Sequence, residues 1–169
     1  MTPAAPLIVT ATFGADDHGW LEGLRRKHFP PERNQVPAHL TLFHHLPPSL
    51  DAELRDRLAA LVRAPVPPAH IMGVMDLGKG TAFRVESEAL SELRADLADA
   101  FRFMLTPQDQ APWRPHVTVQ NKVDRRDATA LQQELGALAF PRPLRLHGLA
   151  SWRYLGGPWE PVRSYPFRG

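Results

Sequence analysis

Two histidines, each followed by a threonine two residues later, are the residues of this chain best suited to chemistry. His39 and Thr41 lie in the run PAHLTLFHHL, and His116 and Thr118 lie in the run RPHVTVQNKV. An imidazole can donate or accept a proton near neutral pH, because its unperturbed pKa is about 6.5. A threonine hydroxyl can donate a hydrogen bond to an oxygen of a bound anion. Facing one another, the two pairs would supply a general base, a general acid and two anion-binding donors.

This set of groups suits displacement at phosphorus. The attacking oxygen needs a base, the leaving oxygen needs an acid, and the other phosphate oxygens need hydrogen-bond donors. A cyclic phosphodiester fits well, because its ring strain makes it reactive with acid-base help alone. The chain has no cluster of aspartates, and we expect neither a metal nor a cofactor. A zinc site of His39, His44 and His45 is not expected, since strand alternation would turn His44 to the opposite face.

The two motifs belong to an internal repeat with a constant offset of 77 residues (116 − 39). A helical stripe of leucines in the first copy falls on leucines in the second: Leu54, Leu58 and Leu61 fall on Leu131, Leu135 and Leu138. Upstream of the motifs, Ile8 falls on Val85 without a gap. Downstream, His70 falls on His147, a pair that we interpret as retained from the duplication rather than as a second site.

The copies cover approximately residues 6–80 and 82–157, and each is expected to fold as strand, helix, strand, helix and strand. In the first copy we predict strands at 6–13, 38–45 and 69–77 and helices at 16–28 and 50–63. In the second copy we predict strands at 82–87, 115–122 and 144–154 and helices at 88–104 and 127–138, followed by a last strand at 161–167. Ser87 is placed to cap the helix that follows it.

Residues 1–169 should form a single domain, because neither copy is long enough to bury its own core. We expect an α+β fold in which the duplicated units form two pseudo-symmetric lobes, with antiparallel sheets lining a central cleft and helices outside. Since side chains alternate along a strand, each motif strand should place four residues on its cleft face. These are His39, Thr41, Phe43 and His45 on the first strand and His116, Thr118, Gln120 and Lys122 on the second.

Four further residues are candidates for substrate binding. Lys122 lies about 20 Å from His116 along an ideal strand, so it should attract a neighbouring phosphate or a base edge. His45 ends its strand, where a role at the substrate rim and no role are equally compatible with the sequence. Trp152 and Tyr154 share one strand face and could stack a nucleobase, although such aromatics more often pack a core.

The composition is that of an ordinary globular protein. Hydrophobic residues make up 43% of the chain, and no apolar run is long enough to cross a membrane. The formal net charge is only +2, which argues against a broad surface for nucleic acid. There is no cysteine, which excludes disulfides, thiolate metal sites and a cysteine nucleophile. The first residues lack the features of a secretory signal, and we expect a cytoplasmic monomer with no membrane partner.

The motifs HLTL and HVTV and the duplicated order of elements resemble the 2H phosphoesterase superfamily, in particular its bacterial 2'-5' RNA ligase and RNA 2',3'-cyclic phosphodiesterase-like branch. The resemblance covers nearly the whole chain. It implies a bilobal fold, metal-free hydrolysis of cyclic phosphates on RNA ends or nucleotides, and catalytic roles for His39, Thr41, His116 and Thr118. The second motif of the family commonly reads H-x-T-L-x-R, and here Asn121 stands at the position of the arginine.

The resemblance implies a 2'-phosphomonoester as product, and 2'-5' RNA ligation when a 5'-hydroxyl replaces water. We expect His39 to act on the departing 3' oxygen and His116 to activate water, although the pseudo-symmetry leaves the reverse assignment open. The alternative hypothesis is a non-catalytic module that binds nucleotides or RNA ends in the same cleft. The intact histidines and threonines argue against it, because a pure binder could use Arg or Lys instead.

Overall fold

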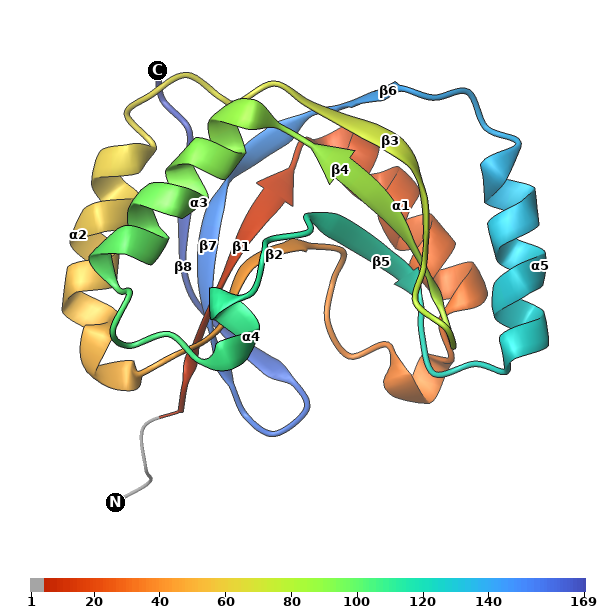
Figure 1. Ribbon diagram of the computed structural model, residues 1–169, viewed down its shortest axis with the longest axis horizontal. Helices are drawn as coiled ribbons and strands as arrows, with labels where there is room; N and C mark the ends of the chain where they lie inside the picture. The colour runs from red at the N-terminus through yellow and green to blue at the C-terminus, as the bar shows by residue number, and fades with distance from the viewer. Residues whose placement is uncertain (1–4) are drawn as a thin grey trace.

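The computed structural model describes residues 5–169, which form two four-stranded antiparallel sheets (Figure 1). Sheet A has the order β2-β1-β7-β8, with β1 at Leu7–Phe13, β2 at Leu40–Leu46, β7 at Leu146–Tyr154 and β8 at Trp159–Pro166. Sheet B has the order β5-β4-β3-β6, with β3 at Ala69–Asp76, β4 at Thr81–Glu86, β5 at His116–Gln120 and β6 at Arg142–Leu144. The predicted α+β class with two pseudo-symmetric halves is confirmed.

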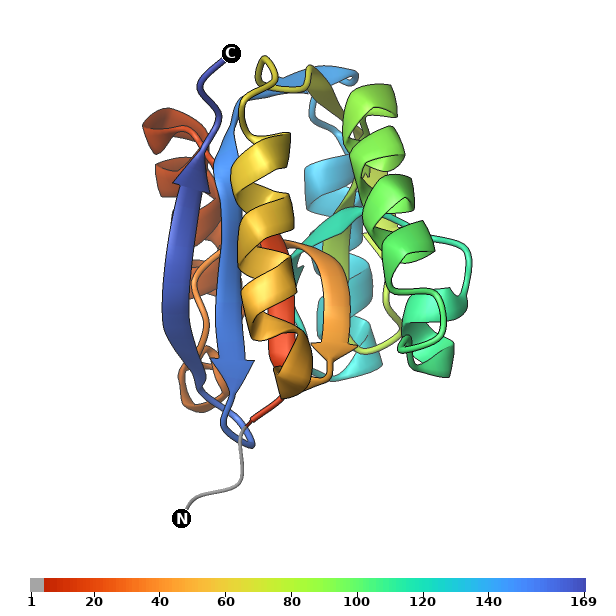
Figure 2. The same cartoon turned by 90° about the vertical axis from the view of Figure 1, so that its left-hand side faces the viewer.

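Four of the five helices lie outside the sheets in two pairs, and the short α4 contacts β2. The helices are α1 at Ala15–His28, α2 at Asp51–Leu61, α3 at Glu88–Ala100, α4 at Pro107–Gln110 and α5 at Arg125–Gly136. Helices α1 and α5 lie against sheet B, and α2 and α3 lie side by side over sheet A (Figures 1 and 2). Ser87 caps α3 as predicted, since its Oγ accepts a hydrogen bond from Leu90 N at 3.2 Å. None of the helices in the described part of the chain is long and apolar enough to span a membrane.

The third strand of each sequence copy joins the sheet of the other copy. Strand β3 follows the first copy's helices but pairs with β4 and β6, whereas β7 pairs with β1 and β8. A pseudo-two-fold relation therefore matches β1 with β4, β2 with β5, β7 with β3 and β8 with β6. One continuous set of buried apolar side chains spans both sheets. The two lobes of the structure therefore do not coincide with the two sequence copies, because each sheet contains at least one strand from the other copy.

The strand pairing corrects the gap-free alignment upstream of the motifs. Thr10 pairs with Thr41 in sheet A, and Ala82 pairs with Thr118 in sheet B. These separations are 31 residues (41 − 10) and 36 residues (118 − 82), so the second copy has five more residues between its first two strands. The expected match of Ile8 with Val85 is therefore wrong. The additional residues fall in the connection that includes α4.

Two further boundaries differ from the predictions. The strand predicted at 144–154 is divided at Arg145, because β6 belongs to sheet B and β7 to sheet A. The helix predicted at 88–104 ends at Ala100. The last predicted strand, which had no counterpart in the repeat, corresponds to β8 and takes the place in sheet A that β6 takes in sheet B.

Candidate active site

The two motif strands meet where the sheets adjoin. Strand β2 lies at one edge of sheet A and β5 at one edge of sheet B, and the two are in contact (Figure 1). His39 immediately precedes β2 and His116 is the first residue of β5. The fold thus brings together the two H-x-T motifs, which are 77 residues apart in the chain.

Both histidines have the same hydrogen bond on one ring nitrogen. His39 Nδ1 lies 2.7 Å from the carbonyl oxygen of Pro37, and His116 Nδ1 lies 2.7 Å from that of Arg114. A carbonyl oxygen only accepts, so Nδ1 must carry the proton in each ring. The neutral form of either imidazole therefore has its lone pair on Nε2. This is the arrangement that a general base requires.

The surroundings of His39 favour its neutral form. Burial lowers its pKa from 6.5 to about 4, against the opposing effect of the Pro37 hydrogen bond, and the charges of Arg25, His116 and His44 lower it further. The Trp159 ring crowds the imidazole, with 4.6 Å between the ring centroids. Because His116 and His44 both act on this pKa, the three imidazoles occupy one region of the molecule.

Each motif threonine is held through its backbone by a residue of the other sequence copy. Trp113 Nε1 donates to the Thr41 carbonyl at 3.0 Å, and Arg25 Nη1 donates to the Thr118 carbonyl at 2.8 Å. Both threonines are half-buried. Within residues 5–169, neither hydroxyl has a protein hydrogen-bond partner, so both can donate to a ligand.

Two buried arginines each bind a backbone carbonyl on the motif strand of the other sequence copy. Arg25 on α1 binds the Thr118 carbonyl on β5, and Arg94 on α3 donates from Nε to the Leu42 carbonyl on β2 at 3.1 Å. Sequence reasoning missed both residues. A signal was present, because Arg94 lies on the same helix face as the buried Leu90 and Leu97, where a solvent-facing arginine would not be expected.

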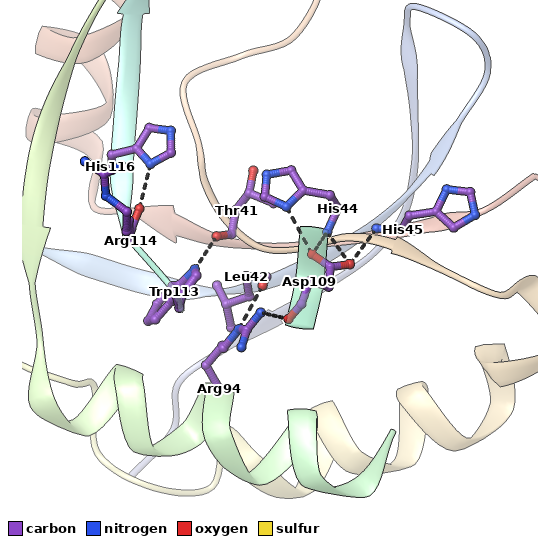
Figure 3. A network of polar contacts seen from close by, with 9 residues as sticks. All are labelled: Thr41, Leu42, His44, His45, Arg94, Asp109, Trp113, Arg114 and His116. Atoms are coloured by element: carbon purple, nitrogen blue, oxygen red, sulfur yellow. Dashed lines mark hydrogen bonds and ion pairs between the residues drawn. The ribbon is translucent and has the colours of Figure 1, made fainter. Parts of the chain in front are cut away.

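A pair formed by His44 and Asp109 was also missed. Asp109, which is 1% exposed, lies 3.1 Å from His44 Nδ1 and accepts from the backbone N–H groups of His44 and His45 at about 3.0 Å (Figure 3). The expectation that His44 faces away from the cleft is wrong: Figure 3 shows its imidazole beside Thr41, on the side toward His116. Strand β2 is irregular between Thr41 and Leu46, which breaks the alternation.

The same irregularity and an early strand end move other residues off the predicted cleft faces. Phe43 is fully buried, and His45 is exposed and points away from Thr41 (Figure 3). Gln120 is buried and accepts a hydrogen bond from the Thr81 hydroxyl at 3.0 Å. Lys122 does not continue the strand, because β5 ends at Gln120 and Lys122 lies in a turn with φ of 63°.

The aromatic candidates lie at the β7–β8 hairpin. Trp152 donates from Nε1 to the Thr10 hydroxyl at 3.1 Å, and Tyr154 is 42% exposed at the strand end. The aromatic ring against His39 belongs to Trp159, which pairs with Tyr154 across the hairpin and has its ring centroid 5.9 Å from that of Trp152. The sequence analysis did not select this tryptophan, since only the hairpin pairing brings its ring against His39.

His70 and His147 lie apart from the two motifs. Both line a cavity of about 980 Å³, together with Asp16, Asp17 and Arg145, and none of the motif histidines and threonines lines it. The two histidines are exposed on β3 and β7. Their interpretation as remnants of the duplication stays a prediction.

Comparisons with known proteins agree with the fold. TT0787 of Thermus thermophilus is similar over 97% of this chain and 98% of its own, with 19% identity and a TM-score of 0.63. E. coli LigT, solved in complex with 3'-AMP, is similar over 98% of this chain and 99% of its own, with 18% identity and a TM-score of 0.58. No curated protein sequence matches significantly. A sequence model of the 2'-5' RNA ligase superfamily matches residues 14–158, and the chain therefore belongs to that superfamily.

Proposed function

We propose that the protein is a metal-independent phosphoesterase that opens a 2',3'-cyclic phosphate on an RNA end or a nucleotide to a 2'-phosphomonoester. The observation that carries the proposal is the matched pair of histidines on strands that adjoin. In each, Nδ1 contacts a carbonyl oxygen and Nε2 has no hydrogen-bond partner among residues 5–169. Membership of a superfamily of phosphoesterases and ligases supports an enzyme that acts on phosphodiester bonds. The complexes of E. coli LigT with 3'-AMP, phosphate and ATP support a nucleotide-type substrate.

In the proposed reaction, one histidine takes a proton from water as the water oxygen attacks phosphorus. The bond from phosphorus to the 3' oxygen breaks, and the second histidine protonates that oxygen. The products are a 2'-phosphate and a 3'-hydroxyl, and proton exchange with solvent restores both rings. The hydroxyls of Thr41 and Thr118 donate to the non-bridging oxygens, where negative charge increases in the transition state.

We assign the base role to His39 and the acid role to His116, which reverses the sequence-based expectation. A base must be unprotonated at the start of the reaction, and burial holds the pKa of His39 near 4. His39 is therefore neutral throughout the neutral range. Trp159, which packs on the same ring, is proposed to keep bulk water from the imidazole and to offer its outer face to a nucleobase.

A 5'-hydroxyl in place of the attacking water would give a 2'-5' phosphodiester by the same proton transfers. The same site would then catalyse RNA ligation and its reversal. We propose this as a second activity of the cleft, because nothing in the base and acid roles distinguishes water from an alcohol. A non-catalytic binding module is disfavoured, since binding alone does not require two matched imidazoles with free Nε2 atoms.

The test is product identification in the presence of EDTA. The protein is incubated with 2',3'-cyclic nucleotides and with oligonucleotides ending in a cyclic phosphate, and products are resolved by phosphorus NMR. We expect a 2'-monophosphate without added metal. Formation of the 3'-monophosphate alone would contradict the proposal. Loss of all turnover in EDTA would also contradict it.

A further inference from the structure

Asp109 is buried, and the hydrogen bonds to its carboxylate all come from two neighbouring residues of β2, His44 and His45. Burial alone would raise the pKa of its carboxyl, but hydrogen bonds from the His44 side chain and from the backbone of His44 and His45 lower it below the usual value. Asp109 is therefore a buried carboxylate at neutral pH. Its oxygens lie 2.9 and 3.0 Å from His44 N and 3.0 Å from His45 N.

The two backbone donors would suffice to anchor α4 to β2. The contact with the His44 imidazole is not needed for that anchoring, and its effect is to hold the ring in position. With Nδ1 held 3.1 Å from Asp109 Oδ1, the ring is fixed and its Nε2 is directed outward. The His44 side chain is 40% exposed, and its Nε2 makes no hydrogen bond to any residue from 5 to 169. The ring lies beside Thr41 (Figure 3), and its charge acts on His39.

The other cations near the cleft have different partners or directions. Arg25 is bound to Asn34 and to the Thr118 carbonyl. Arg94 is bound to the carbonyls of Leu42 and Asp109. Arg84 lies opposite His116 in the register of β4 and β5, but its side chain extends over Gly73 on β3, away from β5.

The pseudo-equivalent position in the second half offers no charge. It is occupied by Asn121, whose Oδ1 accepts from the backbone N–H of Lys122 at 2.9 Å within the turn after β5. Lys122 itself lies in that turn and is exposed. Any positive charge beyond that of the general acid His116 would therefore come from the first half, through His44.

We propose that His44, held by Asp109, is a third histidine of the site, which contacts the phosphate group bound between His39 and His116 and supplies it with positive charge. This inference rests on the proposed function, because it places a phosphate in that cleft. The buried carboxylate compensates the imidazolium and keeps its Nε2–H directed at the anion. His44 differs from His39 and His116 in that it binds the phosphate but moves no proton in the reaction.

The experiment measures the binding of inorganic phosphate and of 2'-AMP by isothermal titration calorimetry at pH 6 and low salt. His44→Asn should raise both dissociation constants about tenfold or more, since a hydrogen bond between charged groups is lost. His44→Lys should restore affinity to within a few-fold of the wild type, because it returns a cation without the imidazole. His70→Asn is the matched control and should bind like the wild type, since His70 lines a cavity apart from the two motifs.

Asp109→Asn provides a second test. It should also weaken binding of both probes, because the ring loses its counter-charge. Its folding is checked by urea unfolding, since Asp109 also joins α4 to β2. If this variant does not fold, the His44 variants decide alone.

Three results would overturn the inference. They are His44→Asn binding within twofold of the wild type, His44→Lys binding as weakly as His44→Asn, and a wild-type protein that binds neither probe. Failure of the proposed function is distinguishable: a protein that binds both probes through His44 but never opens a cyclic phosphate would retain this inference and lose the activity. Conversely, a protein that opens a cyclic phosphate, but whose His44→Asn variant binds both probes like the wild type, would retain the proposed function and lose this inference.

Discussion

The pKa of His39 determines how activity should depend on pH at the level of single residues. As the base, His39 must be neutral, and burial lowers its pKa to about 4. Since kcat/KM reports the ionisations of the free enzyme, it should rise as pH increases through about 4. Because the general acid must stay protonated, kcat/KM should fall again on the alkaline side and give a bell-shaped profile. The measurement is kcat/KM on a 2',3'-cyclic mononucleotide across the acid range. An acid limb near pH 6.5 would contradict the assignment of His39 as a base whose pKa is lowered to about 4.

Trp159 should contribute to that low pKa by limiting hydration of the imidazole. Trp159→Ala exposes His39, so the acid limb of kcat/KM should move upward, toward the ordinary histidine value of about 6.5. Tyr154→Ala removes the aromatic residue that pairs with Trp159 but leaves the His39 contact in place, and its limb should stay at the wild-type position. If the acid limb of kcat/KM falls at the same pH in the wild type and both variants, Trp159 does not lower the pKa of His39.

The same burial predicts a pH-dependent cost to stability. The folded pKa of His39 is about 4, below the unfolded value of 6.5, so the unfolded chain binds the proton between these values. The native state is therefore fully stable above pH 6.5 and loses stability as pH falls toward 4. His39→Asn should gain about 2 kcal/mol relative to the wild type on going from pH 8 to pH 5. Urea unfolding at both pH values measures this, and a parallel pH dependence in the two proteins would refute it.

At the level of the elements, the crossing arginines hold the motif strands in position. Arg25→Met leaves the Thr118 carbonyl without its donor, and the free energy of unfolding should fall by about 1–3 kcal/mol. Arg57→Met is the control, since Arg57 makes an exposed ion pair with Glu53 within α2 and a cation–π contact with Phe101 at 5.7 Å, and the substitution should change stability by less than about 1 kcal/mol. Urea unfolding compares the two variants. A loss no larger for Arg25 than for Arg57 would argue against the crossing contact as a support of β5.

The elements also show what the sequence can reveal and what it cannot. The strands and helices follow from local periodicity and capping, as Ser87 illustrates. The contact of Arg25 with β5 and that of Asp109 with β2 could not be foreseen, because they join residues 93 and 65 positions apart. The irregularity in β2 places the His44 imidazole beside Thr41, since alternation holds only in a regular strand. Motif histidines are thus recognisable locally, whereas their supports require the fold.

At the level of the whole molecule, the exchange of third strands makes each half depend on the other. We propose that residues 1–169 are one folding unit. Fragments 1–78 and 79–169, divided in the β3–β4 turn, should each lack cooperative unfolding alone, because each would lose the partner strands of β3 or β7. Mixing them should restore a folded complex, detectable by circular dichroism and by a dispersed NMR spectrum. Cooperative unfolding of either isolated fragment would contradict the proposal.

The central claim is that two matched histidines perform acid-base catalysis without a metal. The most direct measurement is turnover of a 2',3'-cyclic nucleotide in EDTA by the wild type, His39→Ala and His116→Ala, with folding of each variant verified. A positioned acid or base contributes about 10²–10⁴-fold, so each variant should lose activity by that factor while the wild type works in EDTA. Turnover by either variant within a few-fold of the wild type, or a wild type that EDTA inactivates, would contradict the claim.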